Sequence, residues 1–204
     1  MRTLVILLAV FIVSCEDMTT SLMPRNPDTF TDDRDGKVYK TVDIAGLTWM
    51  AENLAYINYD YYPDTINFPT LRENPVVPLY FDNEEYGVLY NWYAAIEAAP
   101  EGWHLPTELE WDVLINFVGG VDVAGENLKC GNKYKFNAQA GGIKSDEFFN
   151  TRGRIGGWWG EGFSGEQWGY KIYFTGNKQY IIIEDQLSLK AFAKYLSIRC
   201  VKDY

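Results

Sequence analysis

The residues that most resemble a catalytic set lie between Gly102 and Trp111. His104 is the single histidine of the chain, and Glu108 and Glu110 follow it closely. A histidine beside carboxylates is a common acid–base pair, and a nearby serine would extend it to a hydrolase triad. No Gly-x-Ser-x-Gly segment supplies that serine, and one histidine excludes a His-rich zinc site. We therefore expect His104 to make structural hydrogen bonds in front of a helix.

Two glycine-containing segments resemble phosphate-binding loops. Residues Gly160–Gly165 spell Gly-x-Gly-x-x-Gly, but a strand-like segment follows, whereas a dinucleotide-binding fingerprint opens a helix. Residues Gly142–Ser145 lack the upstream glycine of a P-loop. We expect neither segment to bind phosphate.

The acidic segment Thr31–Gly36 superficially suggests a calcium loop. Position 12 of that frame is Val42 instead of the glutamate that completes such a site. A hairpin turn at Asp35-Gly36 is the better interpretation. Calcium on the glycine-rich loops stays open, and we expect no other cofactor.

Aromatic residues around a glycine-rich segment are the main candidates for ligand binding. Glycine fills seven of the seventeen positions from 153 to 169. Aromatic faces stack on sugar rings and other flat ligands. The alternative is burial in the core, which we expect for at least one of the tryptophans. The candidate residues are Trp158, Trp159, Trp168 and Tyr170.

A capped helix is the clearest secondary-structure element. Thr107 and Glu110 are spaced as a capping box, and Gly119-Gly120 ends the pattern. Two apolar stripes at helical spacing predict a deeply buried helix over residues 107–118. They consist of Trp111, Leu114, Ile115 and Val118, and of Leu109, Val113 and Phe117.

The remaining pattern indicates an α+β fold. Alternating residues predict strands over 37–44 and 47–50, joined by a turn at Ala45-Gly46, and a helix around 91–96. After residue 120 the pattern indicates short strands and glycine loops, with a hairpin over 169–183 and a last strand over 195–201. Residues 55–79 form a long irregular section, which is often functional. The N- and C-terminal strands are able to pair.

The N-terminus predicts export and lipid anchoring. A short positive start precedes an apolar run from Leu4 to Val13, which is too short to span a bilayer but suits a signal peptide. Ser14-Cys15 then resembles the end of a lipobox, in which cleavage leaves Cys15 to carry lipid. We predict a signal peptide over 1–14, a flexible tether over 15–30 and one domain over 31–204.

The composition limits the classes of molecule that this protein is expected to bind. The net charge is −10, and no basic patch with interleaved aromatic residues occurs, which argues against nucleic acid. The predicted location is the bacterial cell envelope, in the outer membrane with surface exposure. The predicted partners are the membrane, through lipid on Cys15, and a glycan or surface protein.

Five segments of the chain look familiar: residues 31–39, 48–54, 86–95, 102–107 and 197–203. In this order they resemble the Fibrobacter succinogenes major paralogous domain family. The run from His104 to Trp111 also looks like the formylglycine-generating-enzyme branch of the C-type-lectin-like fold. The resemblance implies two helices packed on antiparallel sheets, with long irregular loops able to hold a ligand.

The cysteines depart from the family pattern. Members often carry a cysteine where this chain has Ala99, so Cys200 loses its expected partner. Cys130 is the remaining candidate, and an exported protein favours pairing of Cys130 with Cys200. Formylglycine-generating oxidases use a close cysteine pair, which this chain does not supply. We therefore expect a ligand-binding domain without catalysis; the alternatives are an assembly role in a surface complex and, less favoured, a divergent enzyme.

Overall fold

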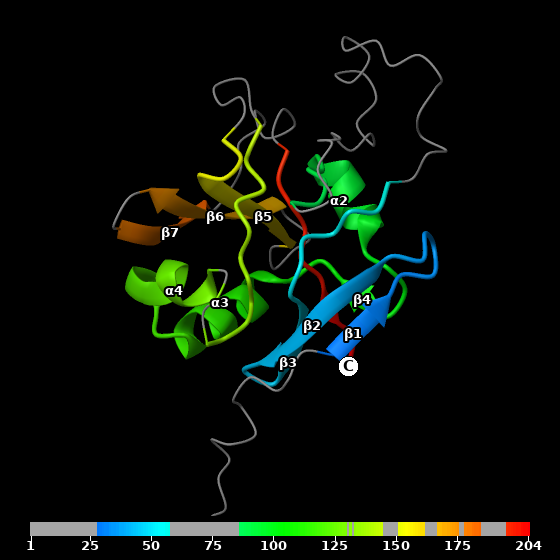
Figure 1. Cartoon of the computed structure of the whole chain (residues 1–204), viewed down its shortest axis with the longest axis horizontal. Coiled ribbons are helices and arrows are strands. Elements are labelled where there is room, and N and C mark those ends of the chain that lie inside the picture. The colour runs from blue at the N-terminus through cyan, green and yellow to red at the C-terminus, as the bar shows by residue number, and fades with distance from the viewer. Residues whose placement is uncertain are drawn as a thin grey trace, which may run out of the picture.

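The computed structural model describes residues 28–57, 86–129, 131, 133–144, 151–161, 167–175, 178–184 and 195–204. These residues form a five-stranded sheet, a three-stranded sheet and three helices (Figure 1). The predicted α+β class is confirmed. In this part of the chain no helix is long and apolar enough to cross a membrane.

The five-stranded sheet joins the two ends of the domain. Its strands are β1 (Asp28–Thr31), β2 (Val38–Ile44), β3 (Leu47–Met50), β8 (Val201–Lys202) and β4 (Trp103–His104), in that spatial order. All neighbours are antiparallel, and Trp49 of β3 lies opposite Val201 of β8. The expected pairing of N- and C-terminal strands is therefore confirmed. Strand β1 begins inside the segment assigned to the tether, because Asp28 pairs with Thr41.

Both predicted turns are present at the start of the domain. Ala45 and Gly46 have φ values of 56° and 81°, the geometry of a two-residue hairpin turn. Gly36 has φ 75° after Asp35. The Asp35-Gly36 pair therefore forms the β1–β2 turn.

Three helices are described: α2 (Trp92–Ala98), α3 (Glu108–Phe117) and α4 (Val121–Leu128). Asn91 caps α2 through its side chain, and α3 begins with the predicted Thr107–Glu110 capping box. Helix α4 corrects the expectation of strands and loops directly after residue 120. Its start lacks a side-chain cap, and Gly125 within it disfavours a helix, so the local pattern carries little helical signal.

The three-stranded sheet contains β5 (Ile155–Glu161), β6 (Gln167–Thr175) and β7 (Lys178–Glu184), in that order. The expected hairpin is β6–β7. Residues 155–161 form a buried strand, which corrects their assignment to a glycine loop. A Cβ on Gly160 would lie 3.1 Å from the Trp111 ring, so glycine permits close packing here.

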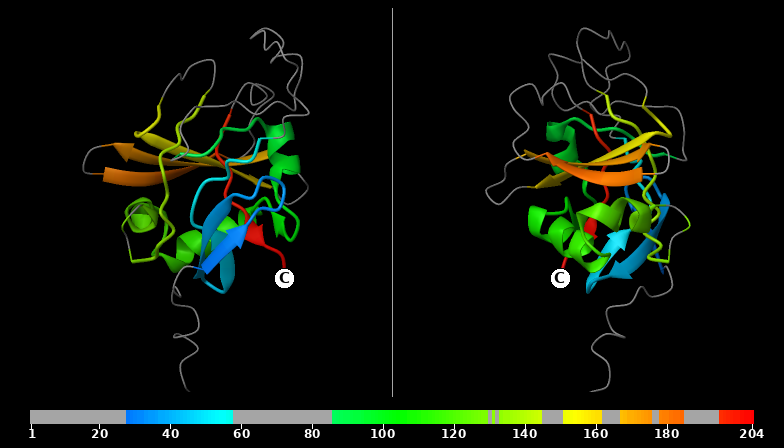
Figure 2. Two further views of the ribbon diagram at one scale, coloured as in Figure 1. Left: turned by 45° about the vertical axis from the view of Figure 1, so that its right-hand side comes forward. Right: turned by 90° about the vertical axis from the view of Figure 1, so that its left-hand side faces the viewer.

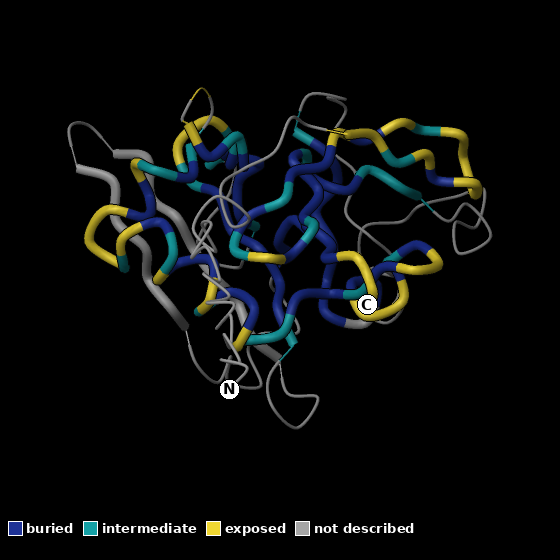
Figure 3. The backbone as a smooth tube through the Cα atoms, turned by 90° about the horizontal axis from the view of Figure 1, so that it is seen from below, coloured by how far each residue is buried: buried dark blue, intermediate teal, exposed yellow. Residues whose placement is uncertain are grey.

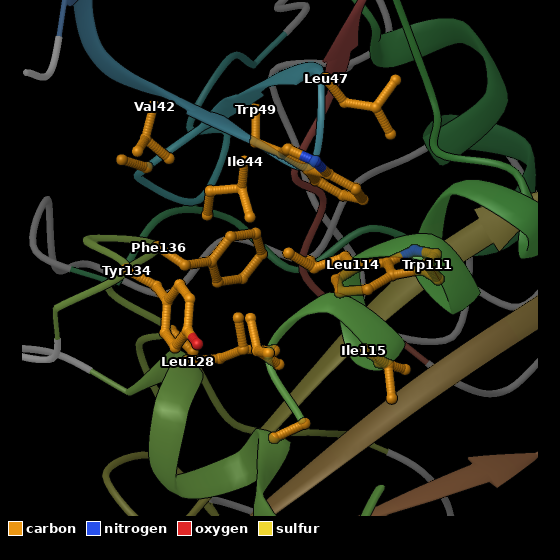
Figure 4. Close-up of a cluster of buried hydrophobic side chains, with 14 of the residues drawn as sticks. Val42, Ile44, Leu47, Trp49, Trp111, Leu114, Ile115, Leu128, Tyr134 and Phe136 are labelled. Carbon is orange, nitrogen blue, oxygen red and sulfur yellow. The ribbon is translucent and has the colours of Figure 1, made fainter. Parts of the chain in front are cut away.

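Two apolar clusters cover opposite faces of the five-stranded sheet. Strand alternation sends Val42 and Val201 into the first cluster with α3 and α4, and Tyr39 and Cys200 into the second with α2. Figure 4 shows the first cluster, where Trp49, Trp111 and Phe136 pack edge to face or tilted. Figure 3 shows the buried backbone gathered at the centre, with exposed positions on the turns.

Helix α3 is less buried than its pattern predicts. The stripe containing Trp111 and Leu114 packs into the first cluster, whereas Leu109 and Val113 are 71% and 38% exposed. The prediction of a deeply buried helix is therefore wrong for the second stripe. One face of α3 rests on the core, and the other faces outward.

Candidate functional site

His104 lies between two carboxylates at the start of α3. Its Nδ1 is 2.7 Å from Asp203 Oδ1, and its Nε2 is 2.9 and 3.0 Å from the two carboxylate oxygens of Glu110. The Thr107 amide and hydroxyl also donate to Glu110, at 2.8 and 2.9 Å. Asp203 follows β8, so the cluster ties the C-terminal segment to the cap of α3. The structural role expected for His104 is consistent with these contacts.

The two carboxylates hold His104 protonated. Its hydrogen bond with Glu110, supported by Asp203, raises the pKa of His104 to about 9. Burial alone would raise the pKa of Glu110, but its bonds with His104 and Thr107 lower it below the usual value. A protonated imidazole is no general base at neutral pH. The cluster is therefore best described as an electrostatic clasp.

Alkaline pH is expected to loosen this clasp. The folded-state pKa of His104 lies above its unfolded value, so its stabilisation is present below about pH 6.5 and is lost as pH rises through about 9. Between pH 6 and 10, the wild type should lose about 1–2 kcal/mol more unfolding free energy than His104→Ala, after allowing for partial exposure. Urea unfolding across that range measures the difference. Equal losses in the two proteins would contradict the assignment.

A second polar cluster is fully inside the protein and centres on Asn53. Its Oδ1 accepts from Trp158 Nε1 at 2.9 Å and from Arg199 Nε at 3.1 Å. Its Nδ2 donates to the Tyr86 carbonyl at 2.9 Å and to Ser197 Oγ at 3.4 Å. Asn53 thus connects β5 and the C-terminal segment to the backbone at Tyr86.

Arg199 extends this cluster beneath the first apolar core. Its side chain is completely buried, and its guanidinium donates to the carbonyls of Phe136 and Asn137. Asn137 has φ 53°, so the backbone turns to present its carbonyl. The contacts identify Arg199 as a structural residue that fixes residues 136–137.

A third cluster centres on Arg34 and the tyrosines near it. Arg34 forms a bidentate pair with buried Asp32 at 2.9 and 2.7 Å, and its guanidinium carbon lies 3.8 Å from the Tyr56 ring centre. The Tyr90 hydroxyl donates to the Tyr56 carbonyl at 2.7 Å. The Ala55 amide donates to the Tyr39 hydroxyl at 3.0 Å. Both carboxylate oxygens of Asp32 therefore pair with Arg34.

Two cation–aromatic pairs lie on neighbouring segments of the chain. They join Lys144 to Tyr195 and Arg152 to Tyr86. Lys144 Nζ lies 5.5 Å from the Tyr195 ring centre, and Arg152 Cζ lies 5.8 Å from that of Tyr86. We call these four residues the cation–tyrosine patch. Such pairs bring positive charge and aromatic faces together.

The patch is held together by short backbone contacts. The Lys144 amide donates to the Tyr195 carbonyl at 3.2 Å, and Thr151 Oγ1 accepts from the Ile143 amide at 2.8 Å. A Cβ on Gly142 would lie 3.0 Å from the Arg152 amide nitrogen, so glycine lets the two segments approach. The two cations therefore stand on neighbouring segments.

The tryptophans proposed for ligand binding divide into two groups. Trp158 and Trp159 have no exposed surface, and their indole N–H groups donate to Asn53 and to the Tyr90 carbonyl. The prediction that they contact ligand is corrected, because alternation along β5 sends each into one of the two apolar clusters. Trp168 and Tyr170 lie on β6, and their side chains are outside the described part of the structure.

The predicted disulfide is not formed in this structure. Cys200 is a buried free thiol, and burial raises its pKa. Cys200 packs into the second apolar cluster. Cys130 and the predicted lipid-bearing Cys15 lie outside the described residues.

The structure offers no grouping for a metal among the residues that it describes. Asp32, in the predicted turn, is completely buried and paired with Arg34. The contacts of Asp32 thus agree with a hairpin turn. Calcium on the glycine-rich segments stays a prediction.

Sequence reasoning missed two buried residues of the polar network, Asn53 and Arg199. Each stands in a segment that carried the family resemblance. Arg199 lies between apolar Ile198 and Cys200, which indicates a buried polar position in a strand, but Asn53 follows Glu52 and carries no such signal. Neither pattern identifies the partner. The partner of His104, Asp203, was missed for the same reason.

A family model described as the Fibrobacter succinogenes major domain matches residues 42–202. The match spans most of the chain, so the chain belongs to this family. Comparison with curated proteins and with solved structures found no match.

Proposed function

We propose that this member of the Fibrobacter succinogenes major domain family is a lipid-anchored, extracytoplasmic ligand-binding domain without catalysis. Lipid on Cys15 would hold it at the bacterial outer membrane, facing outward. The proposal includes a C-type-lectin-like fold related to the formylglycine-generating branch. Paired terminal strands, helices on a sheet and long connecting segments support that relationship.

The position of the cation–tyrosine patch carries this proposal. The described chain begins at β1 and ends at the bottom of Figure 1, whereas the coloured ends bordering segments 145–150 and 185–194 lie at the top. Both views of Figure 2 keep this arrangement. A domain tethered before β1 would therefore present the patch away from the membrane.

The chemistry of the patch favours a glycan that carries acidic groups. The half-buried ring of Tyr86 suits a sugar ring, and the half-buried Lys144 and Arg152 suit carboxylate or sulfate oxygens. Tyr195 is buried, so its role is to support Lys144 and not to contact the sugar. A protein ligand with acidic side chains would use the same contacts.

Two properties support a role without catalysis. The contacts of His104 keep it protonated near neutral pH, and the Cys200 thiol is buried with a raised pKa, which disfavours the reactive thiolate. Neither residue is thus suited to a hydrolase or cysteine-oxidase mechanism. A divergent enzyme is less well supported than a binding domain.

Binding to a glycan array tests the proposal. The protein, expressed with its own signal sequence and solubilised in detergent, should bind acidic glycans better than neutral ones. Lys144→Ala with Arg152→Ala should weaken binding at least tenfold, because both charged contacts are lost. Lys133→Ala is the matched control, since Lys133 lies 4.7 Å from the Tyr134 ring centre outside the patch.

Three outcomes would count against the glycan proposal. They are an array without bound glycans, equal binding of acidic and neutral glycans, and equal loss in the control variant. The first outcome would favour an assembly role instead, which the outward apolar side chains of α3 and α4 support.

A further inference from the structure

Helices α3 and α4 carry an unusual share of the exposed apolar surface. Among the described residues, seven large apolar side chains are exposed, and four of them belong to these two helices. Leu109 is the most exposed of the four, at 71%, although a helical leucine is normally directed to the core. The four are Leu109, Val113, Val121 and Val123.

The apolar side chains of α3 form a stripe beside an acidic one. Leu109 and Val113 are one turn apart, and Glu108 and Asp112 follow the same spacing immediately beside them. Phe117 extends the apolar stripe and is partly buried against the first core. The outward face of α3 is therefore half apolar and half acidic.

The two helices themselves carry charge of one sign, with His104 and Lys129 as neighbouring cations. Residues 108–128 contain five carboxylates and neither lysine nor arginine. Glu110 is committed to His104 and Glu126 pairs with Lys129, while Asp112 and Asp122 lie at the outward side of their helices. A surface of this kind attracts positive charge and repels a second acidic surface.

The face lies away from the cation–tyrosine patch. Figures 1 and 2 place α3 and α4 in the lower part of the molecule, toward the end where the described chain ends. A partner bound to this face would therefore leave the cation–tyrosine patch accessible to its own ligand. This second surface does not depend on the proposed function of the first.

We propose that the outward face of α3 is a docking surface for a partner protein segment that presents apolar side chains bordered by lysine or arginine. Burial of the apolar stripe would stabilise the complex, and Asp112 would pair with a cation at the rim. A second copy would bring the same carboxylates together, and an anionic lipid surface would repel them. Charge complementarity thus selects a basic protein segment.

Two helical peptides of equal length test this surface. One carries a stripe of leucines bordered by lysines, and the other carries the same leucines bordered by glutamates. Fluorescence titration of the full protein should show binding of the leucine–lysine peptide, weakening with salt because the rim pairs are exposed. Leu109→Asn with Val113→Asn should reduce affinity at least tenfold.

Two further variants make the test specific. Val38→Asn is the control, because Val38 is 54% exposed on β2, outside these helices, and should leave affinity within about twofold. Asp112→Lys should weaken the lysine peptide and strengthen the glutamate peptide, and it avoids any dependence on helix stability at Leu109. Thermal unfolding confirms that each variant is folded.

The proposal is wrong if both peptides bind equally or if the double variant binds as well as the wild type. Sedimentation of the protein alone and binding to anionic vesicles complete the experiment. Self-association or vesicle binding that the double variant abolishes would assign the face to a second copy or to the membrane instead.

Discussion

Asn53→Ala is expected to lower the free energy of unfolding by about 3–5 kcal/mol. The substitution removes the acceptor shared by Trp158 Nε1 and Arg199 Nε, both of which are buried. It also removes the donor to the Tyr86 carbonyl. A buried guanidinium that loses an acceptor retains its desolvation cost without the compensating bond, so the loss exceeds that of an ordinary hydrogen bond.

Urea unfolding followed by tryptophan fluorescence measures this effect. Asn116→Ala is the control, because Asn116 is exposed on α3 and should change stability by less than about 0.5 kcal/mol. A loss below about 1 kcal/mol in Asn53→Ala would show that the amide is not the centre of the network. Complete failure to fold, with the control intact, would agree with the prediction.

Trp159→Ala should cost about 3–5 kcal/mol, because it opens a large cavity in the second apolar cluster. Trp159 is fully buried, packs against Trp92 with ring centres 5.6 Å apart, and donates to the Tyr90 carbonyl at 2.6 Å. Removing the indole therefore loses apolar contacts and leaves a buried carbonyl with one partner fewer. The neighbouring glycines of β5 cannot fill the space.

The comparison with Trp159→Phe separates core packing from ligand contact. Phenylalanine keeps much of the buried ring and should recover more than half of the lost stability. Binding by a variant that remains folded should match the wild type, since the indole has no exposed surface. Loss of glycan binding at unchanged stability would show that Trp159 contacts the glycan, which would contradict its role in the core.

Much of the local structure followed from short-range signals. The Thr107–Glu110 capping box, the Ala45-Gly46 turn and the β6–β7 hairpin each depend on residues a few positions apart. Helix α4 was missed because its local signals are weak and Gly125 opposes them. Family membership also followed from the sequence, because the matching segments occur in order.

The candidate sites depended on contacts that the sequence pattern could not supply. His104 meets Asp203 across 99 positions, and Asn53 meets Arg199 across 146. Because these side chains are polar, the sequence indicates that each needs a hydrogen-bond partner. Which residue becomes the partner depends on how the sheet brings β3, β4 and β8 together. The structure shows His104, which resembled a catalytic residue, in an electrostatic cluster with Glu110 and Asp203.

The aromatic residues show most clearly what each level determines. The sequence placed Trp158 and Trp159 side by side in a glycine-rich segment and left open whether they contact ligand or core. The structure places them in β5, where consecutive side chains point to opposite faces. The tertiary structure decided for the core, because both faces of β5 are covered by apolar clusters. For Leu109 the same physics gave the opposite result: its helical spacing indicated burial, but α3 has one covered face. Local pattern fixes the direction of a side chain, and only packing determines what lies in that direction.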